Sequence, residues 1–132
     1  MRSILLILLV FTLSCGNKAV RKSFSGSDSL VIHFKDEQAG VVTKSVETAE
    51  SKAIRKIIGF IDAATTENFN CGFDGKMFFY SKGEQVQEVD FMRGNDSCSH
   101  FVFLLDGKLH STKMNNEASD FLESLEKGRT VY

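Results

Sequence analysis

Short apolar stretches separated by turn residues fill the chain between residues 71 and 113, and this pattern constrains the fold most. The apolar stretches lie within residues 76–80, 86–93 and 101–105, and residues 108–113 follow the last turn as its return strand. Each stretch is long enough for a strand, and the turn residues between them reverse the chain. Asp106-Gly107 indicates a tight hairpin, because a type I′ turn needs a positive φ at both central positions. The segment therefore predicts a meander of four antiparallel strands.

Two stretches with a helical period flank this meander. Between about Ala49 and Ala64 the apolar side chains recur at i, i+3, i+4 and i+7, on Ile54, Ile57, Ile58 and Ile61. The second stretch runs from about Asn116 to Lys127, with apolar positions Ala118, Phe121, Leu122 and Leu125. Such spacing gives each helix one apolar stripe, which must be buried against an apolar surface. Thr48 and Asn116 are the expected N-caps.

Residues 30–34 alternate as a strand does, and residues 41–46 can form a second strand and are candidates for a hairpin with the first. The element order is then β-β-α-β-β-β-β-α. This order predicts an α+β fold, an antiparallel sheet with two helices on one face. Residues 29–132 suffice for one domain with a core. Ser, Gly and Lys are abundant before them, so residues 15–28 are expected to form a flexible tether.

The N-terminus has the layout of an export signal. Arg2 precedes an apolar run over residues 4–11, which ends in Leu13-Ser14-Cys15. A cysteine directly after the small residue resembles the signal of bacterial lipoproteins, in which signal peptidase II cuts before the cysteine and the thiol is acylated. The resemblance covers residues 1–16. It implies that the signal peptide of residues 1–14 is removed and that lipid chains on Cys15 anchor the protein in a membrane.

The location of the anchored protein follows from the same segment. The apolar run is shorter than the roughly 20 residues that span a bilayer. Gly16 rather than Asp follows Cys15, so the retention signal of enteric inner-membrane lipoproteins is missing. The resemblance therefore implies a lipid-anchored protein of the cell envelope, at the outer membrane and facing the periplasm.

The lipoprotein resemblance also bears on the other two cysteines. With Cys15 acylated, Cys71 and Cys98 are an even pair in an oxidising compartment, which favours a disulfide between them. They precede strands that start at the same end of the meander, so their lead-in segments can meet. The alternative is a metal site of Cys71, Cys98 and His100, but isolated cysteines without C-x-x-C spacing make a poor zinc pattern. We expect no metal and no cofactor.

The sequence carries no motif that names a reaction. It lacks the nucleophile elbow, the zinc-protease helix, the P-loop and the dinucleotide-binding glycines. His110 is expected opposite Phe103, where a histidine usually packs against the aromatic ring. Glu88 and Asp90 occupy alternate positions of one strand, as residues of a solvent-exposed face do. A formal net charge of −1, with both signs interspersed, lacks the basic footprint of nucleic-acid binding. We expect no enzymatic activity; a small enzyme whose site is invisible in sequence is the least favoured alternative.

Residues 77–80 and 101–105 are apolar on both faces of their strands. Such strands are usually covered on both sides, whereas two helices cover one face of a sheet of this size. The second face is either buried by curvature and loops or exposed as an apolar patch or groove, which marks a binding site. The candidate binding face carries Phe78, Tyr80 and Phe103.

The expected function is non-catalytic binding of a protein, either a partner or a second copy of this chain. An accessory protein of envelope assembly and an inhibitor or immunity-type protein both fit this expectation. The alternative is a carrier of a small apolar ligand, which would need an enclosed apolar cavity of several hundred Å³.

Overall fold

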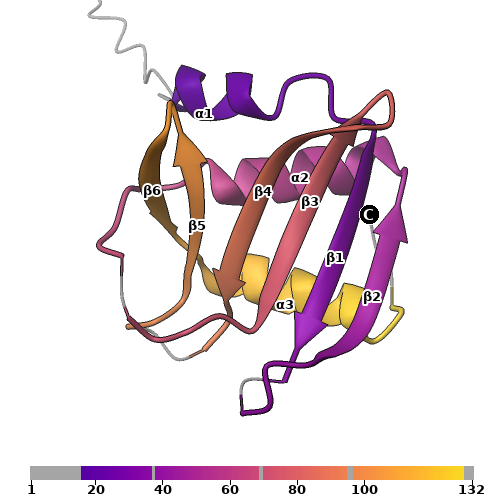
Figure 1. The fold of residues 1–132 in the computed structure, drawn as a ribbon, viewed down its shortest axis with the longest axis vertical. Coiled ribbons are helices and arrows are strands. Elements are labelled where there is room, and N and C mark those ends of the chain that lie inside the picture. The colour runs from indigo at the N-terminus through magenta and orange to yellow at the C-terminus, as the bar shows by residue number, and fades with distance from the viewer. Residues whose placement is uncertain (1–15, 37, 69, 95–96, 130–132) are drawn as a thin grey trace, which may run out of the picture.

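Six antiparallel strands form one sheet in the computed structural model, which describes residues 16–36, 38–68, 70–94 and 97–129. The strands are β1 (Ser29–Lys35), β2 (Val42–Thr48), β3 (Gly75–Ser81), β4 (Glu84–Met92), β5 (His100–Leu105) and β6 (Lys108–Lys113). They lie in the order β2-β1-β3-β4-β5-β6, so the predicted meander of β3 to β6 is present (Figure 1). The helices are α1 (Lys18–Ser23), α2 (Ser51–Ile61) and α3 (Asn116–Glu126). The predicted α+β class is confirmed.

The helices α2 and α3 cover the same face of the sheet (Figure 1). Both apolar stripes are buried there, through Ile54, Ile57 and Ile61 on α2 and through Phe121, Leu122 and Leu125 on α3. Ile58 packs against the same core and is partly buried. The strands contribute Leu30, Ile32, Phe34, Met77, Phe79, Val89, Phe91, Phe101 and Phe103. The predicted packing of two helices on one face is confirmed.

The turns that order the sheet have the expected backbone. β1 and β2 pair as an antiparallel hairpin, which settles the candidate pairing of the first two strands. Asp106 and Gly107 have φ values of 51° and 75°, as a type I′ turn requires. Lys82 and Gly83, between β3 and β4, have φ values of 51° and 80°. Both turns fix which side chains of the following strand face the core.

The helix caps differ slightly from the expectation. Asn115, not Asn116, is the N-cap of α3, and its Oδ1 accepts a hydrogen bond from the N–H of Ala118 at 2.8 Å. Glu50 holds the N-cap position of α2, and the Oγ1 of Thr48 accepts from the N–H of Glu50 at 3.1 Å. The extended backbone of Asn115 lets its side chain reach the first helical turn.

The segment expected to be a flexible tether is folded from Asn17 onward. Asn17 caps α1, and its own N–H donates to Oδ1 of Asp62 at 2.9 Å. Val20 and Phe24 are buried in the core. The expectation of a tether is therefore wrong for residues 17–28, because two apolar side chains, one on a short helix and one directly after it, dock a segment that is otherwise polar.

The signal peptide of residues 1–14 and the lipid attachment at Cys15 lie outside the described residues. Among the helices that the structure does describe, none is long and apolar enough to cross a membrane.

Candidate functional site

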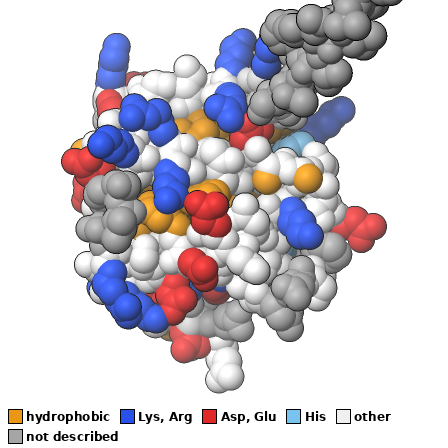
Figure 2. Space-filling view, turned by 180° about the vertical axis from the view of Figure 1, so that it is seen from behind, with side chains coloured by type: hydrophobic (Ala, Val, Ile, Leu, Met, Phe, Trp, Pro, Cys, Tyr) orange, Lys and Arg blue, Asp and Glu red, His pale blue; other side chains and the backbone are white. Residues whose placement is uncertain are grey.

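The face of the sheet opposite the helices is the open face. Its side chains alternate along the strands with those of the core and include Val31, His33, Lys76, Phe78, Tyr80, Glu88, Asp90, Val102, Leu104 and Leu109. Figure 2 shows the opposite, helix-bearing side, where charges of both signs are interspersed and hydrophobic side chains appear in small separate areas. The open face is thus the side of the sheet that α2 and α3 leave uncovered.

The disulfide loop closes one end of the open face. Cys71 lies just before β3 and Cys98 just before β5, and they form the predicted disulfide with a Cα–Cα distance of 5.9 Å. The ring of Phe73 lies 5.8 Å from the ring of His100 at the start of β5. Val102 is buried although it points to the open face. The accessible part of this face therefore lies towards the other ends of β4 and β5.

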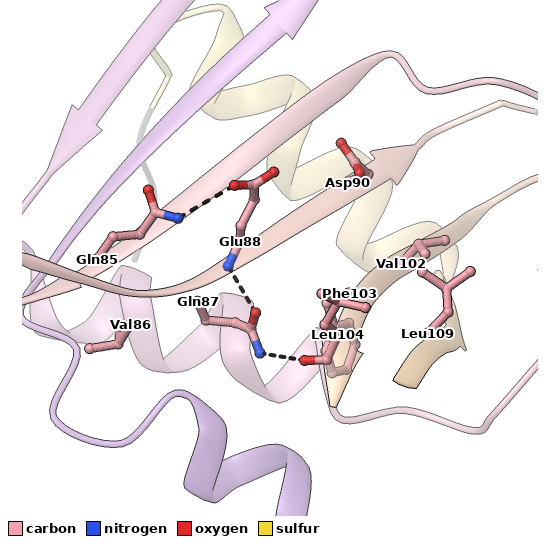
Figure 3. Close-up of a pocket in the computed structure, with 9 residues that line it drawn as sticks. All are labelled: Gln85, Val86, Gln87, Glu88, Asp90, Val102, Phe103, Leu104 and Leu109. Carbon is pink, nitrogen blue, oxygen red and sulfur yellow. Dashed lines mark hydrogen bonds between the residues drawn. The ribbon is translucent and has the colours of Figure 1, made fainter. Parts of the chain in front are cut away.

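β4 and β5 pair along only part of their length. Within the described residues, their register joins Asp90–Met92 to His100–Val102, while β4 begins at Glu84 and β5 continues to Leu105. The two strands therefore separate towards the end of the sheet where α1 lies (Figure 1). The separation leaves a groove of about 530 Å³. Its lining, drawn in Figure 3, consists of Gln85, Val86, Gln87, Glu88, Asp90, Val102, Phe103, Leu104 and Leu109.

The side chain of Gln87 bridges the separated strands. Its Nε2 donates a hydrogen bond to the carbonyl oxygen of Leu104 at 3.0 Å, and its Oε1 accepts one from the N–H of Glu88 at 2.9 Å (Figure 3). A single amide thus joins a backbone donor of β4 to a backbone acceptor of β5. Backbone polar groups removed from water need such partners, and Gln87 supplies them where the strands no longer pair.

Phe24, which follows α1, forms the floor under this part of the sheet. Its ring lies edge-on to the ring of Phe79 on β3, with centroids 4.8 Å apart. It also lies edge-on to the ring of Phe103 on β5, at 5.7 Å. Because β4 runs between β3 and β5, Phe24 packs beneath the point where β4 and β5 separate. The groove is closed on the core side and accessible from the open face.

Two carboxylates make one wall of the groove acidic. Lys76 on β3 forms an ion pair with Glu88, and its Nζ lies 3.5 Å from Oδ1 of Asp90. The hydrogen bond from Lys76 lowers the pKa of the Glu88 carboxyl, and the same bond raises the pKa of the Lys76 ammonium. Glu88 and Asp90 are the charged residues in the groove lining, whereas Lys76 stands outside it.

The three residues of the predicted binding face do not all lie on the same side of the sheet. Phe78 and Tyr80 lie on the open face and are half-buried, and the ring of Phe78 packs 5.2 Å from the ring of His33. Phe103 does not share this face, since it is 3% exposed and belongs to the core, although it borders the groove between β4 and β5. The physical reason is strand alternation, which turns Phe103 towards Phe24 and its neighbour Leu104 towards the open face.

Leu104 and Leu109, the most exposed apolar side chains in the groove lining, were not identified from the sequence. Each is 58% exposed, and they face each other directly across the β5–β6 hairpin. The Asp106-Gly107 turn fixes this register, so the sequence did contain the signal for a paired leucine patch. Gln87 had no such signal, because its role depends on how far β4 and β5 separate.

A second hollow, of about 340 Å³, lies beside Arg93. The guanidinium donates to Oδ2 of Asp74 at 2.9 Å and to Oε2 of Glu126 at 2.5 Å, and it lies over the ring of Phe34 at 4.9 Å. Both carboxylates of this cluster are thus bound to the same guanidinium. The arrangement joins the end of β4 to the end of α3 and serves the fold.

The histidines and cysteines do not form a metal site in the described part of the chain. No group of three or more His, Cys, Asp or Glu residues there could hold a metal ion. The alternative site of Cys71, Cys98 and His100 is wrong, because a disulfide leaves no thiolate to bind a metal. His110 lies opposite Phe103 as expected, with ring centroids 5.3 Å apart.

Comparison with known proteins gives no relative: no protein-family model matches the chain, and no curated protein or solved structure matches it significantly.

Proposed function

We propose that this chain is a lipid-anchored protein of the bacterial cell envelope whose folded domain binds a protein partner without catalysing a reaction. The observation that carries the binding proposal is the groove between β4 and β5. Leu104 and Leu109 together expose an apolar rim beside it, each 58% accessible. Apolar side chains that gather at a hollow on an otherwise well-packed domain favour association.

The lining of the groove favours a protein over a small apolar ligand. Carboxylates and amides from Gln85, Glu88 and Asp90 stand beside the leucines, and such mixed surfaces are typical of protein interfaces. A carrier of a small apolar ligand would use an enclosed apolar cavity, whereas this groove opens along the face of the sheet.

Site-specific photocrosslinking in native envelopes tests the binding proposal. A photoreactive residue at Leu109 should give a discrete crosslinked product, which disappears when Leu104→Ser is added. The matched control places the same residue at Val41, which is 60% exposed but stands outside the groove lining. Equal products from both positions, or a product that survives Leu104→Ser, would show that the groove is not the binding site.

The anchor is proposed from the sequence resemblance alone, with Cys15 as the acylated residue and the outer membrane, facing the periplasm, as the location. Mass spectrometry of the purified protein should find residues 1–14 absent and Cys15 carrying acyl chains. A Cys15→Ser form that is fully processed should leave the membrane fraction. If that form still fractionates with membranes, the anchor proposal is wrong.

A further inference from the structure

The separated strands β4 and β5 present backbone groups that a neighbouring strand normally binds. Among the described residues, the register of this pair stops at Asp90 on β4 and Val102 on β5. Residues 84–89 and 103–105 keep their strand conformation beyond that point. On their other sides they pair with β3 and β6. Their facing edges therefore form two strand edges inside the sheet.

The hydrogen bonds of Gln87 indicate what fits between these edges. In a trans peptide unit the C=O and the N–H point in opposite directions, so one unit accepts from the strand on one side and donates to the strand on the other. The amide of Gln87 makes the same two bonds, accepting from the N–H of Glu88 at 2.9 Å and donating to the C=O of Leu104 at 3.0 Å. At this level the separation has the width of one peptide unit.

The surroundings define the side chains that an inserted segment would carry. On the core side, the rings of Phe24 and Phe103 fill the space, with centroids 5.7 Å apart, so inward side chains must be small. On the open face, the two carboxylates Glu88 and Asp90 share a single cation, Lys76, in the described part of the chain, so the remaining negative charge favours a basic side chain. Leu104 favours a large apolar one. Since successive side chains of a strand point to opposite faces, small residues should alternate with basic or large apolar ones.

We propose that an extended segment of a partner protein inserts between β4 and β5, takes over the two hydrogen bonds of the Gln87 side chain and alternates small residues with basic or large apolar ones. This strand addition rests on the proposed function, because it names how the groove recognises its protein partner. Until the partner segment displaces it, the side chain of Gln87 occupies the space between β4 and β5 that this segment would fill.

The probe for this proposal is a phage-displayed library of random ten-residue peptides, selected on the purified full chain. Enriched peptides should alternate small residues with Lys, Arg or large apolar residues at every second position. Binding of an enriched peptide should slow the exchange of amide hydrogens at residues 84–89 and 103–105. An analogue N-methylated at the residue that bonds to Leu104 should bind about tenfold more weakly, the effect of roughly one lost hydrogen bond.

Two glutamines of the groove provide a matched pair of variants. Gln87→Ala removes the side chain that the peptide must displace, so it should bind the enriched peptide several-fold more tightly. Gln85→Ala should leave the affinity unchanged, because the Gln85 amide contacts the carboxylate of Glu88 instead of bridging the strands. Thermal unfolding of both variants verifies that the fold is intact.

Four results would overturn strand insertion: no enrichment from the library, enriched residues at helical spacing, an N-methylated analogue that binds as well as its parent, or equal affinities of the two glutamine variants. Self-association of the chain that the peptide abolishes would assign the groove to a second copy and would also refute the partner proposal. Crosslinking at Leu109 is measured separately in envelopes. If it still captures a product while the peptide tests fail, the proposed function stands and only the mode of recognition is wrong.

Discussion

Phe24→Ala should destabilise the domain strongly, although the sequence surroundings of Phe24 indicate a tether. The ring is 2% exposed and packs edge-on against two other aromatic rings. Truncation of a buried Phe to Ala costs about 3–5 kcal/mol, because apolar contacts are lost and a cavity remains. With an m-value of about 2 kcal/mol/M in urea, the unfolding midpoint should fall by about 1.5–2.5 M.

Urea unfolding followed by circular dichroism measures this effect, and Lys22→Ala, in the helix directly before Phe24, is the matched control. Lys22 is exposed, so its replacement should change the free energy of unfolding by less than about 0.5 kcal/mol. A Phe24→Ala variant that also stays within about 0.5 kcal/mol of the wild type would refute the packing of α1. Residues 17–28 would then be the flexible tether that their composition suggests.

Three further predictions concern stability. Ile57→Ala should cost about 2–5 kcal/mol in the same urea assay, because Ile57 is buried between α2 and the sheet; a loss below about 0.5 kcal/mol would contradict the helix packing. Replacement of Cys71 and Cys98 by Ser should cost about 3.5 kcal/mol by the chain-entropy relation, and non-reducing peptide mapping of the wild type should find the cross-linked fragment, not two free thiols. Lys76 lowers the pKa of the Glu88 carboxyl from an ordinary value of 4.5. The ionised carboxylate therefore stabilises the fold fully above about pH 4.5, and this stabilisation is lost as the pH falls through the lowered pKa. In Glu88→Gln the free energy of unfolding should therefore fall less steeply with acid than in the wild type, and an unchanged pH profile would show that the ion pair does not contribute.

Periodic patterns allowed most of the fold to be predicted. The stripe of Ile54, Ile57 and Ile61 can be covered only by an apolar surface, and the positive φ favoured at Asp106-Gly107 sets one register for the last hairpin. These features are local, so spacing along the chain reveals them. The disulfide of Cys71 and Cys98 followed from their even count in an expected oxidising compartment, and the predicted strand order supported it by placing both residues at one end of the sheet.

The sequence did not reveal features that depend on contacts between distant segments. Phe24 is the one large apolar residue in a polar stretch, and its burial depends on the rings of Phe79 and Phe103. Phe103 was assigned to the wrong face because β5 is apolar on both sides, so composition alone did not distinguish its two faces. The bridge made by Gln87 arises from the partial separation of two strands, and no local pattern encodes that separation.

The burial of α1 determines how far the domain can stand from a membrane. The backbone N–H of Asn17 is hydrogen-bonded to Asp62. If Cys15 is the acylated first residue, as proposed, only Cys15 and Gly16 link the lipid to the folded domain. At about 3.3–3.6 Å per residue, this two-residue linker is shorter than about 10 Å. With Cys15 acylated, the α1 end of the sheet, where β4 and β5 separate (Figure 1), would rest close to the lipid head groups. Such a protein cannot reach across the periplasm for its partner; the partner would have to present its extended segment at the surface of the same bilayer.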